Sequence, residues 1–435
     1  MPHEHKLSLP TAILININIM LGAGIFMNTT EIGKQTGALG ALAYALVGLL
    51  LLPLISSIAH LVRMHPQGGF YTFARKEISV FAGFISAWSY FTGKLASCAI
   101  IIHAAVKTLQ LLVPALAGIS TFLIDGIILS SFISLNMLDI KAGSIIQSIF
   151  IVFKSLAIAC AIIIGFYLFS PTNVSAANSI WSGLPLTLPI TLYAVMGFEA
   201  ACSLSDKIKD AEKNAPRAIY ISYGIVLSLI ILYQFAFYGA LGPGLAGLEN
   251  YRMAFPALFT ALLPAHLIEA GQLGWFFNVA ITVSAFGGAY GLLFSNGWNL
   301  YTIARHGHVS ELFTRLNGYH IPFACILAEG LLCAAYLIIS QGNQFALQQV
   351  AGLATTMAYT LSVVSLALAR KRRTLDTIPS WVTTFGLVNC AILICACIFA
   401  LMRSGISSLL VFLCLLIAGV IFFVRSGDNE APTIR

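Results

Sequence analysis

Charged residues are scarce in this chain of 435 residues. Lys, Arg, Asp and Glu make up only 9% of it, and hydrophobic residues make up 59%. A soluble domain carries about 25% charged residues. A mean hydropathy of +0.91 over this length therefore excludes a domain with a single anchor and predicts an all-α membrane protein with many spans.

The sequence motifs of common enzymes and metal sites are also missing. The chain has no HExxH, no Walker loop, no CxxC pair and no GxSxG with a suitable histidine and aspartate. Its nine cysteines fall almost entirely in apolar runs, where cysteine is a small packing residue. We expect no enzyme, no cofactor, no metal and no self-contained ATP-driven pump.

The net charge of +7 comes mostly from short loops between apolar runs, so it predicts no nucleic-acid partner. With both termini in the cytoplasm, the inner side holds 17 lysines and arginines and the outer side holds 4. Positive residues favour the cytoplasmic side. We expect a multi-pass protein among the lipids of the plasma or inner membrane, with both termini cytoplasmic. The polar N-terminus lacks a signal-peptide pattern, so the first apolar run is expected to be retained.

Twelve apolar runs approach the ~20 residues that a spanning helix needs. We expect them at about 9–32, 38–62, 80–112, 118–138, 143–169, 184–204, 217–241, 271–303, 322–340, 345–369, 379–402 and 405–425. One transporter domain, 1–435, would then consist of spans 1–5 (9–169), spans 6–10 (184–369) and two final spans (379–425). The longest polar stretch, Ser205–Arg217, is expected to be a loop that Pro216 ends as span 7 begins.

The first span carries Gly22, Ala23, Gly24, Ile25 and Phe26 near its middle. Glycine weakens a helix by ~1 kcal/mol relative to alanine. If the helix breaks here, the freed backbone groups need partners at membrane depth. A bound ligand would supply them. The alternative is that these small residues only allow close helix packing.

A second glycine, Gly197, stands in span 6 and is followed by Phe198 and Glu199. An acid at a helix centre costs ~2.5–3.5 kcal/mol on insertion scales. The two interruptions lie five spans apart, at corresponding positions of two five-span halves. Such matched interruptions indicate an inverted repeat with a binding site at the midplane. Half-helix N-termini there suit a carboxylate.

Five segments together resemble the amino acid–polyamine–organocation transporters. Residues 22–26 resemble the signature G-S-G-I-F, with Ala23 in place of serine, and residues 66–71 resemble P-x-G-G-x-Y. Residues 197–199 match G-F-E, residues 212–219 resemble a fused E-x-K-N-P and P-R-A-I block, and residues 301–307 resemble the loop after span 8. The likeness runs in order along the whole chain. The fused block, and the missing family arginine near the end of span 8, depart from the pattern.

The resemblance implies a LeuT-like core of ten spans plus two, with spans 1 and 6 discontinuous and the substrate between them. Spans 3, 8 and 10 would close the pocket. The substrate α-carboxylate would lie on the N–H groups of Ala23, Gly24 and Ile25. The α-amino group would meet carbonyls near the residues Ile19, Met20, Tyr193 and Met196.

Lys154 lies deep in span 5, about 13 residues or ~20 Å from Lys141. This distance is too long for easy snorkelling to an interface, which is the alternative. Some proton-coupled relatives place a lysine in span 5, where sodium-coupled LeuT-fold transporters bind sodium near spans 1 and 8. We therefore expect Lys154 to take part in proton coupling without a sodium ion.

Lys94 in span 3 either recognises an acidic side chain of the substrate or forms a structural ion pair with Glu199. Glu199 itself could gate the site, accept a proton or pair with Lys94 or Lys154. His103, nearer the outer end of span 3, is expected at the membrane interface. Further candidates around the pocket are Tyr193 and Phe198 as aromatic gates, Ser284 and Gly287 (with Gly288) on span 8, and Thr355 and Tyr359 (with Thr356) on span 10. Each of these has packing as the alternative role.

These observations predict a secondary transporter of amino acids or related amines, with proton-coupled symport by alternating access. An exchanger of amino acids or polyamines is the alternative, and Lys94 argues against cationic substrates. A channel, or a receptor or scaffold that does not transport, is a more remote alternative.

Overall fold

The computed structural model describes residues 6–22, 24–66, 68–138, 140–263, 269–373, 378–404 and 406–426. Ala23, one of the predicted site residues, lies outside these described residues. Within the described ranges the chain is helical, and its β pairing is limited to two isolated bridges, Leu7 with Ile208 and Gly37 with Ser179. The prediction of an all-α fold is confirmed.

Twelve helical passes follow the predicted spans within a few residues at most ends. Two of them are interrupted, the first (α1 and α2) and the sixth (α9 and α10). The passes are α1 (Leu9–Met20) with α2 (Gly24–Met27), α4 (Gly40–Met64), α6 (Val80–Leu112), α7 (Thr121–Asn136), α8 (Ile140–Tyr167), α9 (Leu184–Val195) with α10 (Ala200–Ser203), α11 (Ala211–Leu241), α14 (Glu269–Arg305), α15 (Phe323–Ser340), α16 (Gln344–Arg373), α17 (Ser380–Ser404) and α18 (Ile406–Ser426).

Shorter helices connect these passes. They are α3 (Thr29–Thr36), α5 (Phe70–Glu77), α12 (Pro243–Ala246) and α13 (Ala254–Leu262), with 3₁₀ turns at Pro114–Leu116, Ala176–Asn178, Trp181–Gly183, Ser205–Lys207, Tyr251–Met253 and Glu311–Thr314. By length and composition, nine helices in the described part of the chain can cross a membrane, counting α1 and α2 as one. α7 and the second part of α18 are shorter apolar helices.

The predicted start of the seventh span was wrong. α11 begins at Ala211, so Pro216 lies inside the helix and does not end the preceding loop. Proline at this position removes the N–H that would bond the carbonyl of Glu212. Glu212 is exposed, so water can satisfy that carbonyl and the helix can start early.

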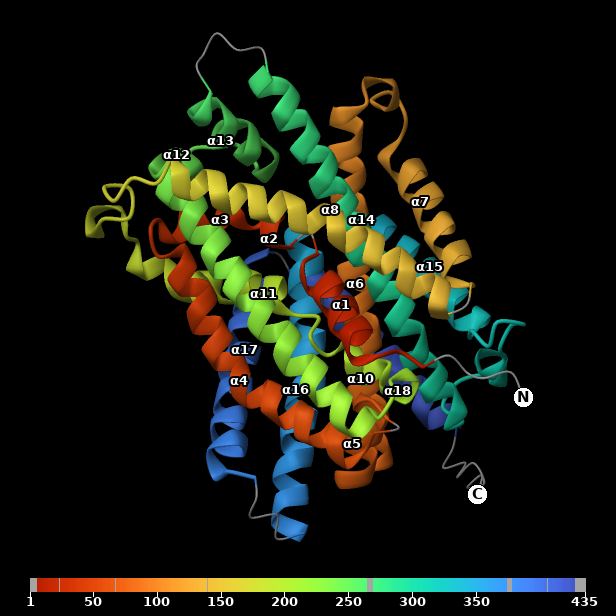
Figure 1. Ribbon diagram of the computed structural model, residues 1–435. Coiled ribbons are helices and arrows are strands. Elements are labelled where there is room, and N and C mark those ends of the chain that lie inside the picture. The colour runs from red at the N-terminus through yellow and green to blue at the C-terminus, as the bar shows by residue number, and fades with distance from the viewer. Residues whose placement is uncertain are drawn as a thin grey trace.

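Four spans of the described chain form the buried centre of the bundle. In the first span, α6, α14 and α16, 71–78% of the apolar stretch is buried, whereas in α8 and α17 the share is 33%. The outer helices expose large apolar side chains such as Ile163 and Leu331, as a surface facing lipid requires. Figure 1 shows α1 and α10 near the centre of the view, with the long helices α4, α11 and α16 alongside.

Candidate functional site

The first span breaks where the two glycines predicted it. α1 ends at Met20, with the Leu21 N–H bonded to Ile17 O (2.8 Å), and helix resumes at Gly24. α14 approaches closely here, because a Cβ added to Gly288 would lie 2.9 Å from Gly22 Cα. Gly24 and Ile25 are the first two residues of α2. The first N–H groups of a helix have no partner within that helix.

The sixth span is also interrupted, as predicted. α9 ends at Val195, Met196 is extended, and Gly197 has a φ of +118°. Glycine reaches this backbone region without a steric penalty. The Gly197 N–H donates to Glu199 Oε2 (2.9 Å), so the acid caps the break from within its own chain.

The two interruptions face each other. A Cβ on Gly24 would lie 3.1 Å from Ala194 Cα and 3.5 Å from Tyr193 Cδ1. A Cβ on Gly197 would lie 3.0 Å from Ile19 Cγ2 and 3.1 Å from the Met20 N atom. The structure thus brings together the predicted residues of spans 1 and 6, and both glycines are needed for the backbones to approach.

Asn16 links the two broken spans, and the sequence reasoning missed it. Its Nδ2 donates to Phe198 O (2.7 Å) and to Ser222 Oγ (3.2 Å), and its Oδ1 accepts from the Ala201 N–H (3.0 Å). One side chain therefore satisfies an acceptor and a donor that the break in span 6 leaves without helical partners. The signal was available, since asparagine is a costly residue in an apolar run.

Lys154 binds the carbonyl end of α1. Its Nζ donates to Asn18 O (2.7 Å) and Leu21 O (2.8 Å), and the side chain is 0% exposed. Ser284 Oγ on α14 also donates to Leu21 O (3.3 Å). Lys154 on span 5 thus contacts the end of α1, where Ser284 of span 8 also binds.

A polar contact from α8 supports the same region. Asn18 Nδ2 donates to Gln147 Oε1 and to Gly287 O (3.0 Å). Gln147 and Asn18 are both buried, and neither was predicted. Gly287 therefore offers a backbone acceptor to α1, whereas its predicted role beside the substrate stays a prediction.

Lys94 and Glu199 form an ion pair in the centre of the bundle, between Nζ and Oε1. Both side chains are at most 3% exposed. Lys94 Nζ also lies 5.1 Å from the centre of the Tyr90 ring, a cation–π contact. In this conformation Lys94 therefore pairs with Glu199, which is one of its two expected roles. Its other expected role, recognition of a charged substrate, stays a prediction.

Aromatic rings cover this ion pair. The rings of Phe198 and Tyr359 have centroids 5.3 Å apart, and Tyr359 lies 6.2 Å from Phe70. Phe198 is the residue before Glu199, so this aromatic contact between spans 6 and 10 lies next to the ion pair.

Thr355 on α16 is another predicted site residue that lies in the buried interior. A Cβ on Gly93 would lie 3.2 Å from Thr355 Oγ1 and 2.7 Å from Ala354 Cβ. Thr355 is 0% exposed and its Oγ1 has no hydrogen-bond partner among the described residues. A buried hydroxyl without a partner costs ~1–3 kcal/mol, which a polar ligand or water can offset.

The predicted site residues that the structure describes are all buried, and none of their side chains is more than 7% exposed. The residues around the two breaks therefore have little contact with solvent in this conformation.

His103 is buried inside the protein, and its depth relative to the membrane surface stays a prediction. It is 2% exposed, its Nδ1 lies 2.6 Å from Asp125 Oδ2 on α7, and its ring stacks on Phe122 at 5.3 Å. The sequence showed only its depth along span 3. The partner that permits its burial comes from another helix.

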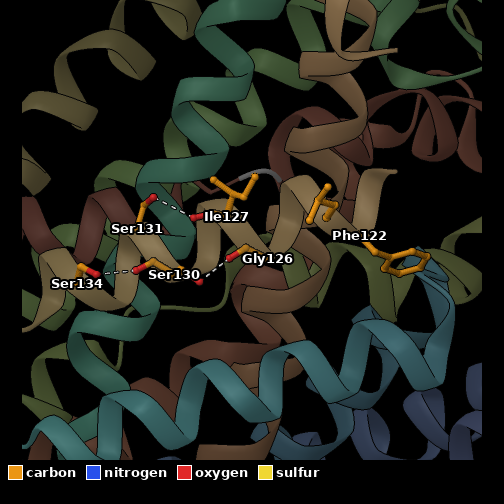
Figure 2. A pocket seen from close by; sticks show the side chains of 7 residues that line it. Phe122, Gly126, Ile127, Ser130, Ser131 and Ser134 are labelled. Carbon is orange, nitrogen blue, oxygen red and sulfur yellow. Dashed lines mark hydrogen bonds between the residues drawn. The ribbon is translucent and has the colours of Figure 1, made fainter. Parts of the chain in front are cut away.

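Two hollows on the outside of the bundle differ in character from this site. Figure 2 shows a groove along α7, where Ser130, Ser131 and Ser134 donate to backbone carbonyls of their own helix at 2.7–2.9 Å. These hydroxyls are already satisfied, and no charged residue lines the groove. The second hollow lies between the ends of α4, α11 and α14 and is lined by both basic and acidic side chains.

The short helix α5 closes the bundle beside that second hollow. Tyr71 Oη lies 2.7 Å from His308 Nε2, and the Tyr71 ring packs 4.2 Å from the His306 ring. Burial raises the pKa of Tyr71 to about 12, so the phenol stays neutral. Burial lowers the pKa of His306, and the positive charges of Arg75 and Arg305 add to that effect.

Among the described residues, no three His, Cys, Asp or Glu side chains are placed to hold a metal ion. Two spanning helices that break at matching positions, with their breaks packed together, define a multi-pass membrane protein of the transporter type. A family model described as amino acid permease matches residues 7–423. The chain therefore belongs to the amino acid permease family.

Individual relatives agree with this family. An uncharacterized transporter of Mycobacterium tuberculosis is 24% identical over 341 residues, covering 76% of this chain and 73% of the relative. The human b(0,+)-type amino acid transporter 1 is 23% identical over 393 residues, covering 85% and 77%. The human Asc-type amino acid transporter 1 is 24% identical over 391 residues, covering 85% and 72%. The family and these relatives are transporters and not enzymes.

Proposed function

We propose that this protein is a secondary active transporter that carries amino acids across the cytoplasmic membrane by alternating access, in symport with protons. One observation carries the proposal: the two broken spans pack together at Gly24 and Gly197 among buried residues, and a new helix starts there at Gly24. Free N–H groups at a helix break suit a carboxylate. The names of the amino acid transporters among the relatives support this substrate class.

The substrate site would run from the first break to α16. The carboxylate would meet the N–H groups of Gly24 and Ile25, together with Ala23. The amine would meet carbonyls of the residues Ile19, Met20, Tyr193 and Met196. Ser284 and Thr355 would border the pocket, and Phe198 and Tyr359 would cover it. Their burial and mutual contacts support this assignment.

The place of Lys154 supports proton coupling. Its Nζ donates to two carbonyls at the end of α1, so the protonated lysine would supply a positive charge there without a sodium ion. A lysine that loses and regains this proton during the cycle would couple transport to protons. The bias of 17 inner against 4 outer positive residues supports cytoplasmic termini.

Transport is tested by counterflow of labelled amino acids in proteoliposomes, which a receptor or scaffold cannot support. The coupling ion is tested by uptake under an inward proton gradient, with and without sodium. We expect counterflow together with uptake that depends on the proton gradient. Uptake that requires sodium and ignores pH would refute the proton coupling, while absence of counterflow for amino acids would refute the substrate class.

An amino acid or polyamine exchanger is the alternative. The ion pair of Lys94 with Glu199 leaves no free carboxylate for a polyamine in this conformation. A thermal-shift screen against amino acids and polyamines separates the two substrate classes. In the same screen, Lys94→Ala is expected to alter the substrate profile; an unchanged profile with lower expression would assign Lys94 a structural role.

A further inference from the structure

Glu329 is an acid in the middle of an otherwise apolar helix, α15. Its side chain is 0% exposed. It points at α14, because a Cβ added to Gly297 would lie 3.3 Å from Glu329 Oε2. Ionisable residues inside spanning helices are rare and mark functional positions. The mechanism proposed above does not use this residue.

Neither carboxyl oxygen of Glu329 has a hydrogen-bond partner among the described residues. The nearest intramembrane lysine that the structure describes on a neighbouring helix, Lys94, is committed to Glu199. An uncompensated buried charge costs several kcal/mol. In this closed conformation the side chain is therefore held as the neutral acid, whereas Glu199 is an ion-paired carboxylate.

The groups around Glu329 do not supply a charge. On α15 the titratable neighbours are the thiols of Cys325 and Cys333, one turn on either side, and Cys98 on α6 faces Cys333. On α14 the neighbour is the amide of Asn296, which donates from Nδ2 to Phe91 O (3.2 Å). The 3₁₀ turn after α14 contributes only Phe313 O, which accepts from Cys325 Sγ (3.2 Å), and α7 contributes apolar Ile133 beside Gly330.

A short chain of hydrogen bonds connects this position with the broken sixth span. Asn299 Nδ2 donates to Asn296 Oδ1 (3.0 Å), and Ser203 Oγ donates to Asn299 Oδ1 (3.1 Å). Ser203 is the last residue of α10. Movement of α10 would break the Ser203–Asn299 bond and leave Asn299, the partner of Asn296, free to reorient beside Glu329.

We propose that Glu329 is a second proton-binding site of the transport cycle, linked to the position of α10 through Asn296, Asn299 and Ser203. This inference rests on the proposed proton-coupled transport. When the seam between α14 and α15 opens to water on the cytoplasmic side, the carboxylic acid gives its proton to a water molecule and becomes a carboxylate. When the seam next opens to the outer side, the carboxylate takes a proton from water there, so each cycle binds one proton outside and releases one inside.

The protonation state can be tested on the wild-type protein with a hydrophobic carbodiimide, which reacts with buried carboxylic acids in their protonated form. Peptide mapping is expected to find the label on Glu329 and not on Glu199, whose carboxylate is ion-paired. Labelling is expected to decrease as the pH is raised. A Glu329 that stays unlabelled at every pH, while other carboxyl groups of the protein react, would overturn the proposal.

The role in transport is tested with Glu329→Gln, which mimics the permanently neutral acid, and with the exposed Glu249→Gln as the matched control. The quantity measured is the ratio of proton-driven uptake to counterflow. Because the amide cannot exchange a proton, the ratio is expected to fall about tenfold or more in Glu329→Gln. Glu329→Asp is expected to recover part of it, and Glu249→Gln is expected to match the wild type.

The outcomes separate the two proposals. An unchanged ratio in Glu329→Gln overturns the role of Glu329 and leaves proton-coupled transport standing. Wild-type counterflow without any proton drive overturns the role of Glu329 and the coupling, but not amino acid transport. Absence of wild-type counterflow overturns the proposed function itself. If Glu329→Gln does not insert, the carbodiimide labelling of the wild type decides.

Discussion

Replacing Lys154 tests whether its two hydrogen bonds hold the first broken span closed. The variant Lys154→Met keeps much of the side-chain volume and removes the donor to Asn18 O and Leu21 O. A hydrogen bond to a charged group contributes about 1.5–3 kcal/mol, so two contribute about 3–6 kcal/mol at most. Leu21 O keeps the bond from Ser284 Oγ, which places the expected loss at the lower end of that range.

This loss acts on the equilibrium between closed and open conformations. Since about 1.4 kcal/mol corresponds to a factor of ten, a loss of about 3 kcal/mol shifts the equilibrium about a hundredfold towards opening. We expect Lys154→Met to lose proton-driven uptake and to melt at a lower temperature, because the carbonyls of α1 lose their donor. Lys154→Arg keeps a cation and is expected to lose less in melting temperature.

The assay combines uptake in proteoliposomes with the melting temperature of the purified protein in detergent. The exposed Lys76→Met is the matched control and is expected to behave as wild type. If Lys154→Met keeps both the melting temperature and the proton-driven uptake of the wild type, the two hydrogen bonds do not hold the break closed, and the coupling must depend on other residues.

Three further predictions concern the breaks and the short helix beside them. Gly24→Leu is expected to abolish uptake while the protein still inserts, because its Cβ would lie 3.1 Å from Ala194 Cα. Normal uptake in this variant would place the site elsewhere. Gly224→Leu is the control, because a Cβ at Gly224 meets nothing within 4 Å. Asn16→Ala is expected to lower the free energy of unfolding by about 2–5 kcal/mol, because Phe198 O and the Ala201 N–H lose their partner. Thermal or denaturant melts measure this loss, and Asn16→Asp should recover part of it by keeping the acceptor. A melt of Asn16→Ala that matches the wild type would contradict the prediction. The pKa of His306 is lowered below its ordinary value of 6.5, so protonation favours the state in which its ring leaves Tyr71, and stability should fall as the pH drops below about 6.5; the wild type should then lose melting temperature relative to His306→Gln, and parallel curves for the two proteins would argue against it.

The order and bounds of the spans could be predicted from the sequence because a spanning helix is a local property. Val80–Leu112 agrees at both ends with its prediction, since the apolar run and the flanking Ser79 cap act over adjacent residues. The two breaks were predictable for the same reason. Glycine lowers local helix stability, and Gly197 does adopt a backbone angle that other residues avoid.

Partners across the fold could not be predicted in this way. Asn16 bonds a carbonyl 182 positions away, and hydropathy along one span contains no information about that contact. The burial of His103 was missed because Asp125, its partner, lies on a different helix. For Lys94 the sequence left two roles open, and only the structure shows that Lys94 on α6 forms an ion pair with Glu199, the residue before α10.

The side chain of Asn16 has a mechanical consequence for the whole bundle. It fastens α1 to the start of α10, and on the other side of the breaks Asn28 Nδ2 fastens the α2 side to Ile190 O of α9 (3.0 Å). The half-helices are therefore linked in two pairs, α1 with α10 and the α2 side with α9. A molecule bound between Gly24 and Gly197 would contact both pairs, so its binding would couple their movements.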